Sequence, residues 1–158
     1  MPNTFFRKPF SRRLYEECNH LGIKTAQAFL TQLGYTMVND VESYTSHDFI
    51  VEKDGRLFKV EAEVTRKWTD REFPYTNMSV PYRKYDNNAD FYVRVNAGGN
   101  ALFFCPMRQV HSAPIITKNT SMTTDEMFYN VPVKDLTLYY LHEDQWCYDE
   151  DEPTSSPA

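Results

Sequence analysis

Apolar positions near the start of the chain recur at intervals close to those of a helix. Between residues 11 and 34 they stand mostly three or four residues apart, which predicts an amphipathic helix. Ser11 can cap the start of this helix and Gly34 can end it. Gly22 lies inside the segment and is a poor helix former, so two shorter helices are an alternative. A short strand is predicted at residues 35–38.

The pattern changes to a two-residue alternation around Asp54-Gly55. An Asp-Gly pair between two alternating runs, here residues 46–53 and 56–65, is a strong signal for a β-hairpin. The second run separates an apolar face from a mainly polar one. The apolar face holds Phe58, Val60, Ala62 and Val64, and the other face holds Leu57, Lys59, Glu61, Glu63 and Thr65.

Later segments predict a second hairpin and several loops. Residues 89–96 and 101–105 flank a Gly-rich turn and are apolar enough to lie in the centre of a sheet. Residues 70–88, with two prolines, predict a loop followed at most by a short helix. We expect a polar loop over residues 112–124, then a short turn or helix, and a strand over residues 136–141. These elements predict one α/β domain, residues 1–142, with a mixed central sheet flanked by helices.

The composition fits this single domain and indicates the cellular compartment in which we expect the protein. A chain of 158 residues, 41% of them hydrophobic, can bury one core. No run of 18 apolar residues occurs, so we expect no membrane span. The N-terminal segment lacks the apolar region of a signal peptide. Cys18, Cys105 and Cys147 lack paired spacing, so we expect reduced thiols and a cytoplasmic protein, in the host cytoplasm if the source is viral.

The negative charge is concentrated at the C-terminus. The net charge is −5, but residues 143–158 hold six acidic residues and no Lys or Arg. The remaining chain has 17 basic and 16 acidic residues, so a polyanionic partner is not excluded. Residues 143–158 predict an acidic, disordered tail. It could keep the protein soluble or compete with a polyanion for a basic groove.

The predicted first hairpin would cluster carboxylates. With a two-residue loop at Asp54-Gly55, the pairing places Asp48 opposite Glu61, with Cβ atoms about 5 Å apart. Glu63 follows on the same face, and Lys59 lies beside them. Like charges facing each other destabilise a sheet, whereas a divalent cation such as Mg²⁺ binds one or two carboxylates together with water and phosphate oxygens. The alternative is an exposed polar face with tolerated repulsion or one protonated carboxylate, and a one-residue slip would separate the groups.

Several of these segments together resemble the PD-(D/E)XK nucleases. The resemblance rests on Leu33-Gly34-Tyr35 at the helix end, the isolated Asp48, the Glu61-x-Glu63 pair, and the strand pair at residues 90–107. It extends over residues 14–110 and implies a restriction-endonuclease-like core in a metal-dependent endonuclease that hydrolyses DNA. It implies that Asp48 and Glu61 bind Mg²⁺ or Mn²⁺.

Glu63 departs from the family pattern, in which most members have Lys. The resemblance then implies that Glu63 orients or deprotonates the attacking water, or binds a second metal. Lys59, or Lys67 beyond the strand, would supply the missing positive charge.

Basic and aromatic residues follow the acidic hairpin and predict a nucleic-acid surface. Cations bind phosphates, and exposed bases stack on aromatic rings. The basic residues are Arg66, Lys67, Arg71, Arg83 and Lys84. A solvated loop and helix face is the alternative, as it is for a second basic cluster at Arg7, Lys8, Arg12 and Arg13.

Two other functional classes stay open. A nuclease fold without catalytic activity could bind nucleic acid or a protein partner, for instance as a viral or mobile-element product. An unrelated α+β structural or assembly protein is the third class. A homodimer is compatible with the family resemblance, although the sequence identifies no dimer surface.

Overall fold

The long first helix of the chain is continuous. The computed structural model describes residues 12–38, 48–82, 88–119 and 125–149. Its first element is helix α1 (Arg12–Gln32). Gly22 does not break the helix. It lets α1 approach the sheet, because a Cβ atom at this position would lie 3.2 Å from Cγ2 of Val64. Gly34, with a φ of 97°, follows the helix as predicted.

Seven strands form a mixed sheet in the order β1-β2-β3-β5-β6-β9-β10. All neighbouring strands are antiparallel except β3 and β5, which are parallel. The strands are β1 (Thr36–Val38), β2 (Phe49–Lys53), β3 (Arg56–Thr65), β5 (Phe91–Asn96), β6 (Ala101–Pro106), β9 (Leu138–His142) and β10 (Gln145–Tyr148).

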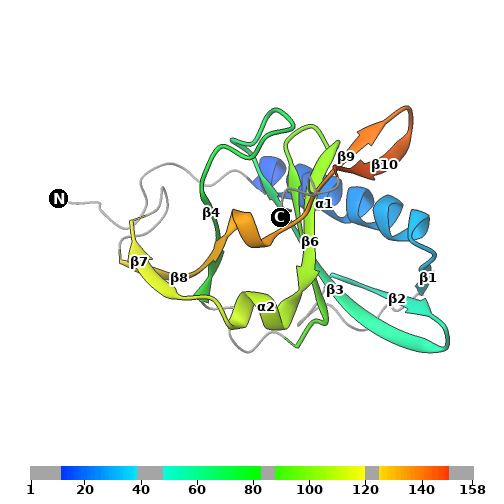
Figure 1. Cartoon of the computed structure of the whole chain (residues 1–158), viewed down its shortest axis with the longest axis horizontal. Coiled ribbons are helices and arrows are strands. Elements are labelled where there is room, and N and C mark those ends of the chain that lie inside the picture. The colour runs from blue at the N-terminus through cyan, green and yellow to red at the C-terminus, as the bar shows by residue number, and fades with distance from the viewer. Residues whose placement is uncertain (1–11, 39–47, 83–87, 120–124, 150–158) are drawn as a thin grey trace, which may run out of the picture.

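A second, three-stranded sheet has the order β4-β8-β7. Its strands are β4 (Asn77–Pro81), β7 (Ile115–Lys118) and β8 (Glu126–Pro132). The remaining elements of the described residues are the five-residue helix α2 (Met107–His111) and the 3₁₀ turn η2 (Val133–Asp135). Figure 1 shows the large sheet nearly edge-on, with α1 on one side and the small sheet with α2 on the other.

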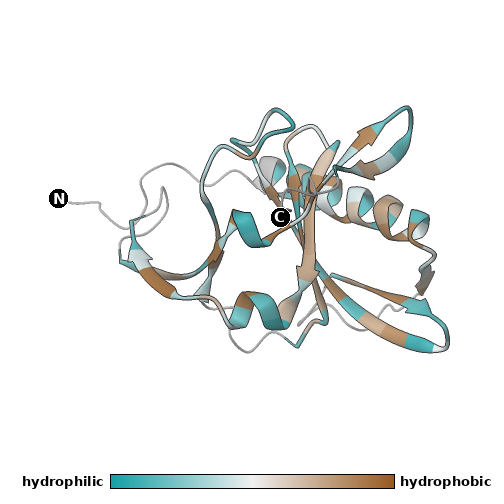
Figure 2. Ribbon diagram, viewed as in Figure 1, coloured by the Kyte–Doolittle hydropathy of each residue, from teal (hydrophilic) through white to brown (hydrophobic). Residues whose placement is uncertain are grey.

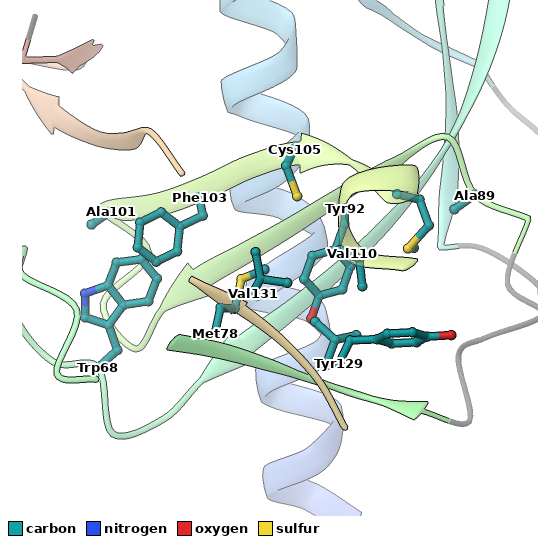
Figure 3. Packing of buried hydrophobic residues seen from close by; sticks show 12 residues of the cluster. Trp68, Met78, Ala89, Tyr92, Ala101, Phe103, Cys105, Val110, Tyr129 and Val131 are labelled. Atoms are coloured by element: carbon teal, nitrogen blue, oxygen red, sulfur yellow. The ribbon is translucent and has the colours of Figure 1, made fainter. Parts of the chain in front are cut away.

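Each face of the large sheet has its own core. On the α1 side, Phe29 and Leu30 pack against Val60, Val93 and other apolar side chains of the large sheet. On the opposite side, apolar residues of β5 and β6 pack against β4 and β8. Figure 3 shows the ring of Tyr92 pointing from the large sheet toward Val131 and Tyr129 of the small one. Figure 2 shows hydrophobic colour along the central strands and mixed colour on α1, as an amphipathic helix requires.

The predicted register of the first hairpin is confirmed for five pairs, whereas the predicted pair of Asp48 and Glu61 does not belong to the ladder. Five pairs run from Lys53 opposite Arg56 to Phe49 opposite Val60. Asp54 and Gly55 have φ values of 53° and 78°, the left-handed geometry of a type I′ turn. The second predicted hairpin is also confirmed, as β5 and β6.

Other predictions require correction. The large sheet is not flanked by helices on both faces, because the second face is covered mainly by the small sheet. That sheet lies in segments predicted as loop or helix, namely residues 77–81, 115–118 and 126–132. Residues 143–149, which are predicted as part of a disordered tail, belong to the fold, since β10 pairs with β9 and buries Trp146 against α1. Residues 150–158 lie outside the described residues.

The structure also bears on the predicted reduced thiols and on the predicted absence of a membrane span. Cys18, Cys105 and Cys147 are all free. Burial raises the pKa of Cys105 to about 12, so this thiol is neutral and unreactive at physiological pH. Among the described residues, no helix has the length and apolar character to cross a bilayer.

The turn at Asp54-Gly55 generates a stability prediction. Gly55→Ala should lower the free energy of unfolding by about 1–2 kcal/mol, because an L-residue is strained at positive φ. No heavy atom lies within 4 Å of the added Cβ, so the loss would come from the backbone alone. Gly98→Ala is the matched control, since Gly98 lies in the other hairpin turn, without a positive φ and with ordinary contacts at 3.5 Å. Urea unfolding measures both, and equal losses would contradict the assigned turn geometry.

Candidate active site

Asp48 lies immediately before β2 and departs from the regular ladder. Its N–H donates to the Val60 carbonyl at 2.8 Å, although Val60 is already the pairing partner of Phe49. Two consecutive residues therefore face Val60, which is the arrangement of a β-bulge. The Asp48 carboxylate then accepts a hydrogen bond from the N–H of Ala62 at 2.9 Å. Asp48 thus binds both chain neighbours of Glu61 and is not its ladder partner.

Glu61 occupies the middle of β3, one residue beyond the last pair with β2, where β3 pairs with the parallel strand β5. It stands beside Tyr92 in the β3–β5 register and is only 8% exposed. Its neighbours Val60 and Ala62 belong to the core on the α1 side, so Glu61 points to the other face. A carboxylate this deeply buried needs polar partners, because an isolated buried charge is strongly destabilising.

Glu63 belongs to a buried polar network. The Tyr92 hydroxyl donates a short hydrogen bond to its carboxylate, and Nη2 of Arg94 lies 3.7 Å from the same oxygen. Arg94 donates from Nε and Nη2 to the Tyr92 hydroxyl, at 2.9 and 2.6 Å. Its Nη1 donates to the Thr65 hydroxyl at 3.1 Å, and its Nη2 donates to the Ser79 carbonyl at 2.7 Å. Arg94 therefore joins β3 and β5 of the large sheet to β4 of the small one.

The network keeps a positive charge inside the protein. The Arg94 side chain is 10% exposed. Burial opposes its charge, but the nearby Tyr92 and Glu63 outweigh burial and raise its pKa. Burial is also the main cause that raises the pKa of Tyr92 well above its usual value. The group brings the Arg94 guanidinium, the Tyr92 hydroxyl and the Glu63 carboxyl group into direct contact.

The predicted three-carboxylate metal site does not form as one cluster. Among the residues that the structure describes, no three His, Cys, Asp or Glu side chains form a group that could hold a metal ion. Asp48, Glu61 and Glu63 are all described, and Glu63 faces Tyr92 and Arg94. The arrangement that stays open is a pair of carboxylates, Asp48 and Glu61, which matches the number that Mg²⁺ commonly takes from protein.

Lys59 lies on the same face of β3, two residues before Glu61. It pairs with Ile50 of β2, and its side chain is half-buried. Its N–H donates to the Asp90 carboxylate at 2.8 Å, and the Asp90 N–H donates to its carbonyl at 2.8 Å. These bonds hold the backbone of Lys59 at the start of β5. The predicted role of the Lys59 ammonium in catalysis stays a prediction.

The predicted basic surface is only partly within the described residues. Arg66 and Lys67 are exposed in the turn after β3. Arg71 is also exposed, and it contacts Tyr140 and Asp149. The predicted residues Arg83 and Lys84 lie outside the described part, as do Arg7 and Lys8 of the second cluster.

Sequence reasoning missed Tyr92 and Arg94. The segment was predicted as a central strand because of its apolar character, and its polar residues were given no role. The available signal was the alternation of Phe91, Val93 and Val95 with Tyr92 and Arg94. Such an alternation places both polar side chains on one face, and in the structure this is the face that carries Glu61 and Glu63.

The chain was compared with protein families, with curated proteins and with solved structures. No family model matches the chain, and no curated protein matches its sequence. Among solved structures, a bacterial homing endonuclease matches with a TM-score of 0.48 and 20% sequence identity, over 67% of this chain and 72% of that one.

The Arg94 network generates a stability prediction. Arg94→Leu should lower the free energy of unfolding by about 3–5 kcal/mol, because it leaves buried polar groups and the Glu63 charge without their partner. Arg108→Leu is the control, since Arg108 is exposed on α2 and undergoes the same chemical change. Equal effects of the two substitutions in urea unfolding would contradict a structural role for Arg94.

Proposed function

We propose that this protein is a metal-dependent endonuclease that hydrolyses phosphodiester bonds in DNA, with Asp48 and Glu61 as its metal-binding carboxylates. The observation that carries the proposal is the attachment of Asp48 to both neighbours of the buried Glu61. These bonds place an acidic residue at a bulge beside the backbone of a buried Glu, a position that stability alone does not require. Bulges are frequent next to active sites, where they redirect a side chain.

The donor chemistry fits Mg²⁺ or Mn²⁺. Both carboxylates offer the hard oxygen ligands that these ions prefer, and two such groups leave room for water and substrate phosphate. When bound, the ion would polarise the scissile phosphate and lower the pKa of a coordinated water.

The remaining side chains prepare the site for an anionic substrate. The Ala62 N–H fixes the orientation of the Asp48 carboxylate, and the central position of β3 fixes Glu61. Arg94 offsets the negative charge of Glu63, so this acid repels an approaching phosphate less than an unpaired one would. Glu63 is then a positioning residue between Glu61 and the Arg94 network. Lys59 supplies a positive charge to the phosphate from the same face.

A second candidate is a nuclease fold without catalytic activity that binds nucleic acid or a protein. The observation that favours it is that Glu63 contacts Tyr92 and Arg94. With these partners, Glu63 is less suited to bind a metal ion. A cleavage assay separates the two candidates, because only the first requires hydrolysis.

The cleavage assay uses isosteric variants. Wild-type protein with Mn²⁺ should nick supercoiled plasmid, and Asp48→Asn or Glu61→Gln should reduce nicking at least a hundredfold, since each removes one charged ligand. Asp48→Asn keeps an oxygen that can accept from Ala62. Glu52→Gln is the control, because Glu52 is exposed on β2 and loses the same charge. Absence of nicking on duplex, branched and single-stranded DNA would reject the enzymatic proposal.

Binding generates a separate prediction for the turn after β3. Replacing both Arg66 and Lys67 by Ala should weaken duplex binding and reduce the slope of log K against log salt by about 0.9 for each lost phosphate contact. The control is Lys24→Ala with Arg108→Ala, which removes the same charge from exposed positions on α1 and α2. If both double variants change the slope equally, the DNA surface does not include this turn.

A further inference from the structure

Arg71 and Tyr140 form an anion-binding arrangement at the edge of the fold. The guanidinium carbon of Arg71 lies 3.3 Å from the centre of the Tyr140 ring, so the cation stacks on the aromatic face. Tyr140 belongs to β9, whereas Arg71 belongs to the loop after β3. The loop is held in place by Trp68, which is fully buried and donates from its indole N–H to the Arg71 carbonyl at 3.2 Å. The stacked pair is therefore built on fixed elements.

This pair binds a carboxylate of the same chain. Nη2 of Arg71 donates to Oδ2 of Asp149 at 3.3 Å, and the Tyr140 hydroxyl donates to Oδ1 at 2.7 Å. The two oxygens of one anion are thus bound by two different donors. The hydrogen bond to Asp149 is the main cause that raises the pKa of Tyr140. Asp149 itself follows β10 directly and is 78% exposed.

The surface beside Asp149 carries a further positive charge. A surface hollow of about 360 Å³ lies beside Asp149 and is lined by residues 134–138, Tyr148 and Asp149. Lys134 brings a second positive charge to this hollow. A guanidinium can donate to a phosphate as it does to a carboxylate, because its fork of N–H groups matches both anions.

We propose that Arg71 and Tyr140 form a binding site for a backbone phosphate of DNA, and that Asp149 occupies this site as an internal competitor. The proposal rests on the function proposed above, because it names the DNA contact and its regulation. Asp149 is a weak occupant by physical criteria. Its ion pair with Arg71 is exposed to solvent on both sides, and such pairs contribute little to stability. A duplex that presents many phosphates at once can therefore displace it.

The test compares two substitutions of equal charge. Asp149→Asn frees Arg71, whereas Asp144→Asn removes the same charge from the exposed turn between β9 and β10, where its φ of 64° suits Asn. Duplex binding is measured in EDTA, without hydrolysis, over a series of salt concentrations. Asp149→Asn should bind at least threefold tighter than Asp144→Asn, because the phosphate no longer has to displace a carboxylate from Arg71. The two salt slopes should be equal, because the number of phosphate contacts in the complex is the same.

The gain must depend on Arg71. In an Arg71→Ala background, Asp149→Asn and Asp144→Asn should bind DNA equally, because the competed cation is gone. Tyr140→Phe keeps the aromatic ring and removes the hydroxyl that would donate to the phosphate, so in the Asp149→Asn protein it should reduce the gain in affinity. This second variant tests the site from the other donor.

The outcomes separate this proposal from the proposed activity. Equal binding by Asp149→Asn and Asp144→Asn, including the absence of binding by both, would overturn the phosphate site. A gain that persists without Arg71 would overturn it as well. Nicking by the wild-type protein with Mn²⁺ tests the enzymatic function independently. Nicking without any Asp149 effect rejects only the phosphate site, whereas an Arg71-dependent gain without nicking rejects only the activity.

Discussion

The buried guanidinium of Arg94 is the constraint on which the site and the two-sheet packing depend. A charge buried between two sheets destabilises the fold unless polar groups surround it. The partners of the Arg94 guanidinium are Tyr92, Thr65, Glu63 and the Ser79 carbonyl. These partners come from three strands, so the charge sets how the small sheet docks on the large one. The same contacts occupy Glu63 and leave Asp48 with Glu61 as the pair best suited to a cation.

The parts of this architecture that follow from local chemistry could be predicted from sequence. The Asp54-Gly55 turn has one favoured geometry, and that geometry determines the register of all five pairs between β2 and β3. The position of Asp48 was not predictable, because the ladder ends at Phe49 and the bulge depends on hydrogen bonds beyond the turn. The Glu63–Arg94 contact was also missed, since the parallel pairing of β3 with β5 joins residues that no local pattern connects.

The small sheet was missed for a different reason. Pro81 is one of the two prolines that predict a loop over residues 70–88. It ends β4 and pairs with Phe128 of β8, because proline is accepted at strand ends and edges. Strand β7 is mainly polar or exposed, so its residues carry no strong alternation. The net negative charge of the chain does not by itself prevent DNA binding, because basic residues can be grouped on one surface. One acidic residue can cover such a basic residue, as Asp149 does in its ion pair with Arg71.

The central claim is that Asp48 and Glu61 bind a divalent cation while Glu63 does not. The most direct measurement is the shift in melting temperature that Mn²⁺ produces, because an ion that binds only the folded protein raises that temperature by mass action. The shift should be present in the wild-type protein and in Glu63→Gln, and absent in Asp48→Asn and Glu61→Gln, each compared with its own melting temperature without metal. A wild-type melting temperature unmoved by Mn²⁺, or an equal shift in all four proteins, would contradict the account.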